Sequence, residues 1–305
     1  MTKEKLLPIL LTNYSLNTTQ EKGLAKLFKQ IASMKVSERD ADDWFILGYV
    51  EIKDEHADEA LDNFDRAIEL NDTFEAAYRF RSSAYAMLKD FKNAEKDASK
   101  AIELDPDYAD AYYERAFIHK SLYEWDKAIA DCDKVLELQP DATHARLLKA
   151  KIYYDSEQYE ESIVEYGAVI EEDPKSVDAI SSRGLALFFA GKFEEALSDI
   201  KKARVLEGGS IISEFNMGLI SSAIPEKSKE AYRHLEKAFR KDGNLLRQYI
   251  EFSDKKESTR LIDRLHSIFK DIKKRKGENF YTKELHDLLE RKLKDANAIL
   301  KEKQD

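Results

Sequence analysis

Apolar and small residues recur along this chain with a period of 34 residues. Between residues 41 and 244 the apolar side chains follow spacings of three and four, the pattern of a helix that buries one face. Two such segments fill each period, and a short polar turn separates them. The repeated columns hold a small residue (Gly48, Ser82, Ala116, Ala150, Gly184, Gly218), a second small residue (Ala60, Ala94, Ala128, Ser162, Ala196) and an aromatic (Phe91, Trp125, Tyr159, Phe193). The pattern predicts a series of helix pairs.

These columns have a consistent physical explanation. Neither helix of a pair could bury its apolar face alone, so neighbouring pairs must stack. The small residue on the first helix and the alanine that opens the second allow two backbones to approach closely, and the aromatic fills the remaining space. Pro106, Pro140 and Pro174 end second helices, because proline does not fit a helix interior. The sequence therefore predicts an all-α fold.

The repeated residues resemble the tetratricopeptide repeat (TPR) family. Trp44, Leu47 and Gly48 match the opening of its consensus, while Tyr85, Tyr153 and the three prolines occupy later signature positions. The resemblance implies a right-handed α-solenoid of helix-turn-helix repeats, with helical caps at its N-terminal and C-terminal ends. It covers residues 41–208 as five TPR repeats.

Outside these five repeats the pattern changes. Residues 209–244 are expected to form a sixth, irregular repeat: Ala231 follows Gly218 by 13 positions, where the other repeats have 12, so the turn should be longer. We interpret residues 1–40 as an N-terminal helical cap or a decayed repeat. Residues 245–305 are interpreted as a C-terminal helical cap or docking region, since apolar residues at helical spacing must be buried somewhere.

Composition limits the classes of protein to consider. Of 305 residues, 43% are hydrophobic and 36% charged, with only 10 glycines and 5 prolines, which is typical of a folded, mostly helical protein. Cys132 is the only cysteine, so an intrachain disulfide and a cysteine metal cluster are excluded. The apolar run at residues 6–11 contains Pro8 and is too short for a secretion signal, and no run is long enough to span a membrane. We therefore expect a cytoplasmic protein.

The net charge of −10 is unevenly distributed. Residues 245–305 carry 16 basic and 12 acidic side chains, so the rest of the chain is strongly acidic. An acidic body argues against nucleic-acid binding over the whole surface, because like charges repel the phosphates. The basic run at residues 270–276 is interpreted as a solvated helix end, and a nucleic-acid-associated factor that uses the basic C-terminal helices remains the alternative function.

No arrangement of residues points to catalysis. The six histidines are scattered, and His286 with Glu290 supplies two metal ligands at best. His119 stands in an aromatic column and is interpreted as a packed core histidine, as Cys132 is a core residue. Gly208 and Gly209 lack the flanking strand and lysine of a phosphate-binding loop. We expect a protein that is not an enzyme and that needs no cofactor or metal.

The family resemblance implies that the first helices of the repeats line a concave groove. In this sequence the corresponding partner-binding residues are Phe45, Tyr49, Arg79, Phe80, Tyr113, Glu114, Phe117, Leu147, Lys151, Tyr154, Leu185 and Phe188. Family members that bind the C-terminal carboxylate of a partner place asparagine, lysine and arginine in such a groove. Here those three positions hold Phe80, Asp110 and Glu114, so a carboxylate-clamp ligand is not expected.

The remaining groove is largely apolar and aromatic. A soluble protein rarely leaves such a surface bare. Either an amphipathic or hydrophobic segment of a partner protein docks there, or the chain's own terminal helices fill it, and the sequence leaves both open. The function expected from the sequence is that of a non-enzymatic scaffold or adaptor for protein–protein interaction.

Overall fold

The computed structural model describes residues 2–12 and 16–242, together with isolated residues between 245 and 298. Within these residues the chain contains fourteen α-helices, two 3-10 turns and no strand, so the predicted all-α fold of sequentially packed helices is confirmed. No helix in this part is long and apolar enough to cross a membrane. The chain divides into two compact units, Met1–Ile152 and Tyr153–Asp305, which are described separately.

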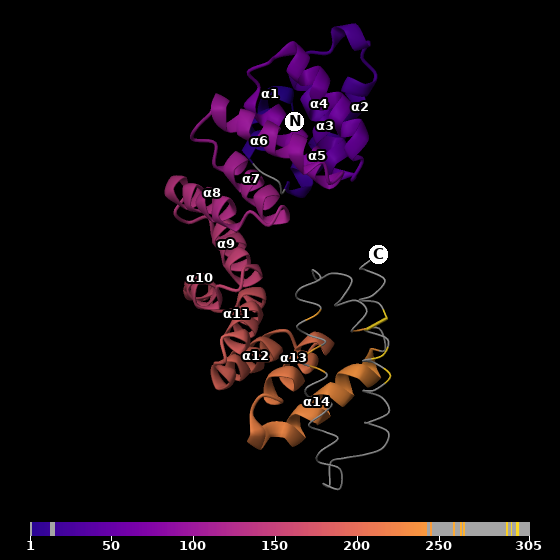
Figure 1. Ribbon diagram of the computed structural model, residues 1–305. Coiled ribbons are helices and arrows are strands. Elements are labelled where there is room, and N and C mark those ends of the chain that lie inside the picture. Colours follow the sequence, from indigo (N-terminus) through magenta and orange to yellow (C-terminus); the bar gives the residue numbers. More distant parts are fainter. Residues whose placement is uncertain are drawn as a thin grey trace. The chain divides into compact units, whose positions relative to one another are not determined.

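Unit 1 is a sequence of helices in which each packs against the next (Figure 1). Its elements are α1 (Lys3–Thr12), α2 (Thr18–Ala32), the 3-10 turn η1 (Val36–Glu38), α3 (Ala41–Lys53), α4 (Ala57–Leu70), α5 (Glu75–Met87), α6 (Phe91–Leu104), α7 (Ala109–Ser121), α8 (Trp125–Leu138) and most of α9 (Thr143–Asp155). Asn17 caps α2: its side chain accepts hydrogen bonds from the backbone N–H groups of Thr19 and Gln20.

Unit 2 continues the same alternation of first and second helices. Its elements are α10 (Tyr159–Glu172), α11 (Val177–Phe189), α12 (Phe193–Leu206), α13 (Ile211–Ser221), the 3-10 turn η2 (Pro225–Lys227) and α14 (Ser228–Lys241). The longer turn expected in the sixth helix pair is present, because η2 lies between α13 and α14. Leu245 and Leu265 are buried in the core of this unit.

The five helix pairs from α3 to α12 are built alike. Each first helix has 13 residues and each second helix 14. Within each pair the middle residue of the three-residue turn has a positive φ, and the next backbone N–H bonds to a carbonyl five residues earlier. These middle residues are Glu55, Lys89, Tyr123, Glu157 and Gly191. This bonding closes the first helix as a Schellman motif and turns the chain back.

A recurring ion pair joins the two helices of a pair. Arginine on the first helix and aspartate 16 residues later on the second form two hydrogen bonds in three of the pairs, Arg81–Asp97, Arg115–Asp131 and Arg183–Asp199. The aspartates are buried or nearly so. Paired hydrogen bonds of this kind fix direction as well as distance, so they help to set the register of the two helices.

The small residues of the first helices lie where two helices touch. A Cβ added at Gly48 would stand 2.6 Å from a ring carbon of Phe64, and one at Gly184 would stand 2.8 Å from Ile200. Where the first helix carries the larger Ser82 or Ala116, the facing residue is smaller, Ala98 or Cys132. Cys132 is fully buried, as the sequence predicted.

Replacement of Gly48 by alanine is expected to destabilise the protein by about 1–3 kcal/mol, because the facing ring cannot move aside. The ring of Phe64 is fully buried and packs against Phe45 and Phe80, at centroid distances of 5.9 and 6.1 Å. Chemical denaturation measures the change. Gly167→Ala is the control: its Cβ would meet only Arg183, at 3.8 Å, so alanine should be neutral or stabilising by up to about 1 kcal/mol. Equal effects of the two substitutions would contradict the assigned close contact.

Candidate functional site

The expected groove corresponds, in unit 1, to the surface formed by the first helices α3, α5, α7 and α9. We call this surface the groove face. Nine of the twelve residues singled out in the sequence lie on these helices within unit 1: Phe45, Tyr49, Arg79, Phe80, Tyr113, Glu114, Phe117, Leu147 and Lys151. The structure places them in two different environments, one covered and one open.

The part of the groove face on α3 and α5 is covered. Phe45, Tyr49, Arg79 and Phe80 retain 2% exposure or less. The ring of Phe80 meets Phe45 at 5.4 Å and Tyr49 at 5.3 Å between centroids, both edge to face, which is a favoured arrangement of aromatic rings. These side chains belong to the hydrophobic core of unit 1.

Helix α1, the chain's own N-terminal helix, is part of this covered core. Leu6 and Leu10 are fully buried in the same core cluster as the aromatic rings. The ammonium of Lys3 lies 2.7 Å from a carboxylate oxygen of Asp40 and 2.8 Å from one of Asp43, at the start of α3. At the other end of α1, the hydroxyl of Tyr108, just before α7, donates a hydrogen bond to the Leu11 carbonyl at 3.5 Å. Helix α1 therefore runs from the beginning of α3 to the beginning of α7.

The sequence leaves occupation by a terminal helix open, but it does not identify α1 as the occupant. Leu6 and Leu10 are four residues apart, the spacing that places two side chains on one face of a helix, and this was the available signal. The local sequence pattern does not predict, however, which surface of the fold such a helix will cover.

Charged groups below α1 balance one another. A guanidinium nitrogen of Arg79 lies 3.3 Å from a carboxylate oxygen of Asp110, and the guanidinium stacks over the ring of Phe80 at 4.0 Å. Burial raises the pKa of Glu114, although Arg79 and a hydrogen bond with Ser83 act in the opposite direction. One buried cation thus lies between two carboxyl groups, and this part of the groove face offers no unbalanced positive charge to an incoming carboxylate.

The part of the groove face on α7 and α9 is more open. Phe117 keeps 47% exposure, Lys151 is exposed, and Tyr113 and Leu147 are partly buried. The ring of Tyr113 packs edge to face against that of His144, at 4.8 Å between centroids. An exposed phenylalanine flanked by a tyrosine, a leucine and a lysine is a surface that can take up apolar side chains.

The three remaining residues belong to unit 2. Tyr154 and Phe188 are 8% and 6% exposed, and each packs against Phe189, at 5.9 and 5.1 Å between ring centroids. Leu185 is partly buried. In unit 2 these predicted partner-binding aromatics are therefore already packed within their own unit.

Comparison with protein families gives matches over three stretches of the chain. A model described as "TPR repeat" matches residues 150–191, and two models described as "Tetratricopeptide repeat" match residues 98–130 and 45–109. All three stretches lie within the series of helix pairs from α3 to α12. No curated protein matches the chain.

Solved structures resemble the fold. A tetratricopeptide repeat protein from Parabacteroides merdae is 21% identical, with a TM-score of 0.56, over 77% of this chain and 91% of that one. YrrB, described as a TPR protein with an unusual peptide-binding site, is 21% identical with a TM-score of 0.50, over 62% of this chain and 95% of its own. MamA is also 21% identical, with a TM-score of 0.50, over 53% and 95% of the two chains. At this identity the likeness concerns the fold alone.

Proposed function

We propose that this chain, a tetratricopeptide repeat protein, binds an amphipathic helical segment of a partner protein on the groove face of unit 1. Tetratricopeptide repeats are generally protein-interaction modules rather than catalysts, and a scaffold role follows from the fold. We further propose the surface that binds the partner and the type of segment that the partner contributes. The observation that carries it is the position of α1, an amphipathic helix already seated on the groove face with Leu6 and Leu10 fully buried.

Helix α1 has features of an exchangeable occupant. It has ten residues and contains Pro8, which cannot donate a helical hydrogen bond. An isolated helix of this length is marginal in water even without proline, so α1 owes its helical form to docking. A partner helix that supplies the same contacts without the proline would compete with it for the aromatic floor.

The contacts of α1 define the chemistry of such a partner. Two large aliphatic residues four positions apart would take the places of Leu6 and Leu10. A lysine or arginine one turn before them would pair with Asp40 and Asp43, as Lys3 does. A C-terminal carboxylate has no place in this description, because Asp110 and Glu114 would oppose it. YrrB, whose fold is similar, is described as having a peptide-binding site, which agrees with a peptide-like ligand.

The open part of the groove face would be the first point of contact. Tyr113 and Phe117 are accessible while α1 is in place, and aromatic residues at the centre of an interface often contribute about 2 kcal/mol or more each. A partner could bind there first and then displace α1 from the neighbouring aromatic floor. The basic run at residues 270–276, which the alternative nucleic-acid function would use, lies outside the described residues.

Capture of the partner from the native host tests this proposal. A Tyr113→Ala/Phe117→Ala variant should keep its helix content and capture at least about tenfold less partner, as the loss of one aromatic anchor implies. The matched control, Val164→Ala/Val205→Ala, removes exposed apolar side chains from the second helices α10 and α12 and should capture as much partner as the unchanged chain. Equal loss in both variants, or in neither, would contradict binding at the groove face.

A further inference from the structure

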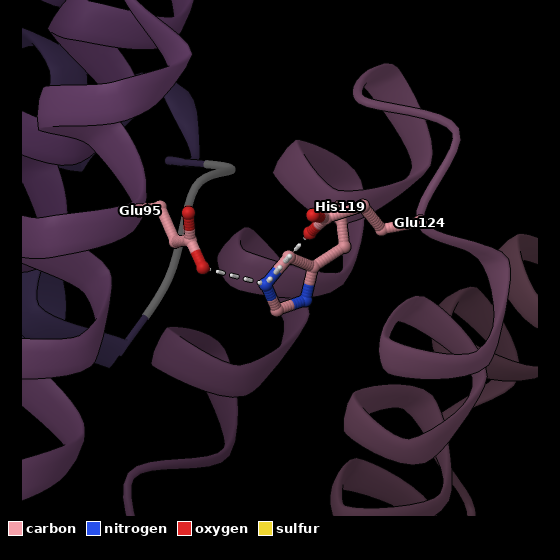
Figure 2. Close-up of side chains that lie close together, drawn as sticks. All are labelled: Glu95, His119 and Glu124. Carbon is pink, nitrogen blue, oxygen red and sulfur yellow. Dashed lines mark hydrogen bonds and ion pairs between the residues drawn. The ribbon is translucent and has the colours of Figure 1, made fainter.

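Three potential metal ligands converge where the second and third helix pairs meet. They are Glu95 on α6, His119 on α7 and Glu124 in the turn before α8 (Figure 2). The Nε2 atom of His119 lies 3.2 Å from a carboxylate oxygen of Glu95 and 3.8 Å from one of Glu124. All three ligand atoms lie within 4.8 Å of one another. Figure 2 shows both carboxylates directed at the imidazole.

The imidazole is held in one orientation by the recurring ion pair of this fold. Its Nδ1 atom lies 3.0 Å from a carboxylate oxygen of Asp131, whose two oxygens also accept hydrogen bonds from Arg115. Nδ1 therefore donates its proton to Asp131, and Nε2 is the ring nitrogen directed at Glu95 and Glu124. A carboxylate that orients a histidine in this way is the usual outer partner of a metal-bound imidazole.

The residues at this position differ from those of the other repeats. The column that holds Glu95 is otherwise aliphatic, with Leu61, Ile129, Ile163 and Leu197. The column that holds His119 contains Glu51, Tyr85, Tyr153 and Leu187 in the other pairs, and no second pair joins a polar residue in this column to a carboxylate in the column of Glu95. An apolar contact between successive pairs has thus been replaced, in this one place, by a carboxylate and an imidazole. Packing alone does not require that replacement, because the aliphatic and tyrosine residues fill the same space elsewhere.

A positive charge is needed among these groups. The carboxylates of Glu95 and Glu124 both face Nε2 of His119, and this arrangement requires either a proton on Nε2 or a bound cation between the three groups. Lys127 supplies part of this charge from the side: its ammonium lies 3.0 Å from Glu124 and 4.0 Å from Glu95. The carboxylates of Glu95 and Glu124 are more than one third exposed, so the cluster is reachable from solvent.

We propose that Glu95, His119 and Glu124 bind a divalent transition-metal ion of the Zn²⁺ class. Zn²⁺ accepts nitrogen and carboxylate ligands at about 2.0–2.2 Å in a tetrahedron, which places neighbouring ligand atoms about 3.3 Å apart. The distance from Nε2 to the Glu95 oxygen, 3.2 Å, is already close to this value. Rotation of the Glu124 side chain would shorten its distance to Nε2 from 3.8 Å to the same value. Water would complete the tetrahedron on the solvent side. The ion would tie α6 to α7 and to the following turn, and so strengthen the contact between two successive repeats.

Calorimetric titration of the full chain with Zn²⁺, after treatment with a chelator, tests the site. One ion per chain is expected to bind, with an increase in melting temperature. In a Glu95→Gln/Glu124→Gln variant the affinity should fall by at least about 100-fold, since even the loss of an outer partner costs 10–100-fold. Both side chains are partly exposed, so this variant should fold. Its melting temperature without metal checks that it does.

Two further variants make the result specific. Glu51→Gln/His56→Gln removes another histidine–glutamate contact, of 2.9 Å, outside the cluster and should leave Zn²⁺ binding unchanged. Lys127→Gln removes the competing ammonium and should tighten binding by about tenfold. The proposal is overturned if the unchanged chain binds no stoichiometric ion. It is equally overturned if Glu95→Gln/Glu124→Gln weakens binding less than tenfold, or if Lys127→Gln leaves the affinity unchanged.

Discussion

Replacement of Leu6 and Leu10 by aspartate is expected to detach α1 from unit 1 and to leave the helix pairs folded. Burial of a leucine side chain contributes about 1.5–3 kcal/mol, so the two fully buried leucines together contribute about 3–6 kcal/mol to docking. A carboxylate at either position could not be buried without a partner. Detachment of α1 would expose Phe45 and Tyr49 on α3 and Phe80 on α5, which are almost completely buried in the unchanged chain.

Three measurements detect the detachment of α1 in the Leu6→Asp/Leu10→Asp variant. Binding of a hydrophobic dye should increase, trypsin should cleave the chain after Lys3 or Lys5, and amide exchange on α3 and α5 should accelerate only modestly. A Lys5→Asp variant changes the net charge by the same two units at an exposed position of α1 and should behave as the unchanged chain. Unchanged dye binding and protection from trypsin in the Leu6→Asp/Leu10→Asp variant would mean that α1 does not cover the aromatic floor.

Replacement of Glu214 by glutamine is expected to destabilise unit 2 by an amount on the order of 3 kcal/mol at neutral pH. The side chain of Glu214 is 3% exposed and is surrounded by Arg204 at 2.9 Å, His234 at 2.6 Å and Lys237 at 2.5 Å. Burial alone would raise the pKa of Glu214, but hydrogen bonds from these three groups lower it from 4.5 to about 2. Each pKa unit corresponds to about 1.36 kcal/mol, and glutamine would in addition leave three donors around a neutral group.

The pH dependence of this effect has a definite sign. Because the pKa of Glu214 is lower in the folded state, its stabilising contribution is complete above the ordinary pKa of 4.5 and is lost as the pH falls towards about 2. The difference in unfolding free energy between the chain and Glu214→Gln should therefore be constant from pH 5 upward and shrink in acid. Glu236→Gln removes only an exposed pair with Arg240 and should change stability by about 0.5 kcal/mol or less. An equal effect of both substitutions would contradict the buried cluster.

The helix pairs could be predicted because their signal is repeated. A single occurrence of Ala60 or Ala94 carries little information, but a small residue at five positions 34 apart, alanine at four and Ser162 at one, indicates that two helices touch there. The structure buries these residues completely. The longer turn after Gly218 could be predicted for the same reason, since one additional residue is visible against a regular background.

The turns inside the pairs could not be predicted in the same detail. Glycine is the residue that usually adopts a positive φ, yet only one of the five equivalent turns has glycine, Gly191, at that position. Glu55, Lys89, Tyr123 and Glu157 adopt that conformation because the flanking helices pack against each other, and this is a tertiary effect. Position in the repeat, rather than residue type, determines the backbone here.

The two sites proposed here depend on contacts distant in sequence. The packing of α1 into one core with residues of α3 and α5 is a tertiary effect, and the sequence of α1 alone predicts only a helix with apolar side chains. The interpretation of His119 as a packed core residue was correct in its burial but gave no information on its polar neighbours. The substitution of Glu95 into an aliphatic column was visible in the sequence, and comparison of columns across adjacent repeats would have paired it with His119.

We infer that the groove face of unit 1 binds an amphipathic helix and that α1 occupies it in the resting chain. The most direct test titrates a fluorescent peptide of residues 2–12 into the full-length Leu6→Asp/Leu10→Asp variant and follows its anisotropy. Saturable binding is predicted, with a Kd of about 100 µM or tighter. Binding to the unchanged chain should be at least about tenfold weaker, because the tethered α1 competes at a high effective concentration. A peptide that itself carries Leu6→Asp and Leu10→Asp should not bind. If the peptide fails to bind the variant, or binds both chains equally well, the groove face is not a helix-binding surface.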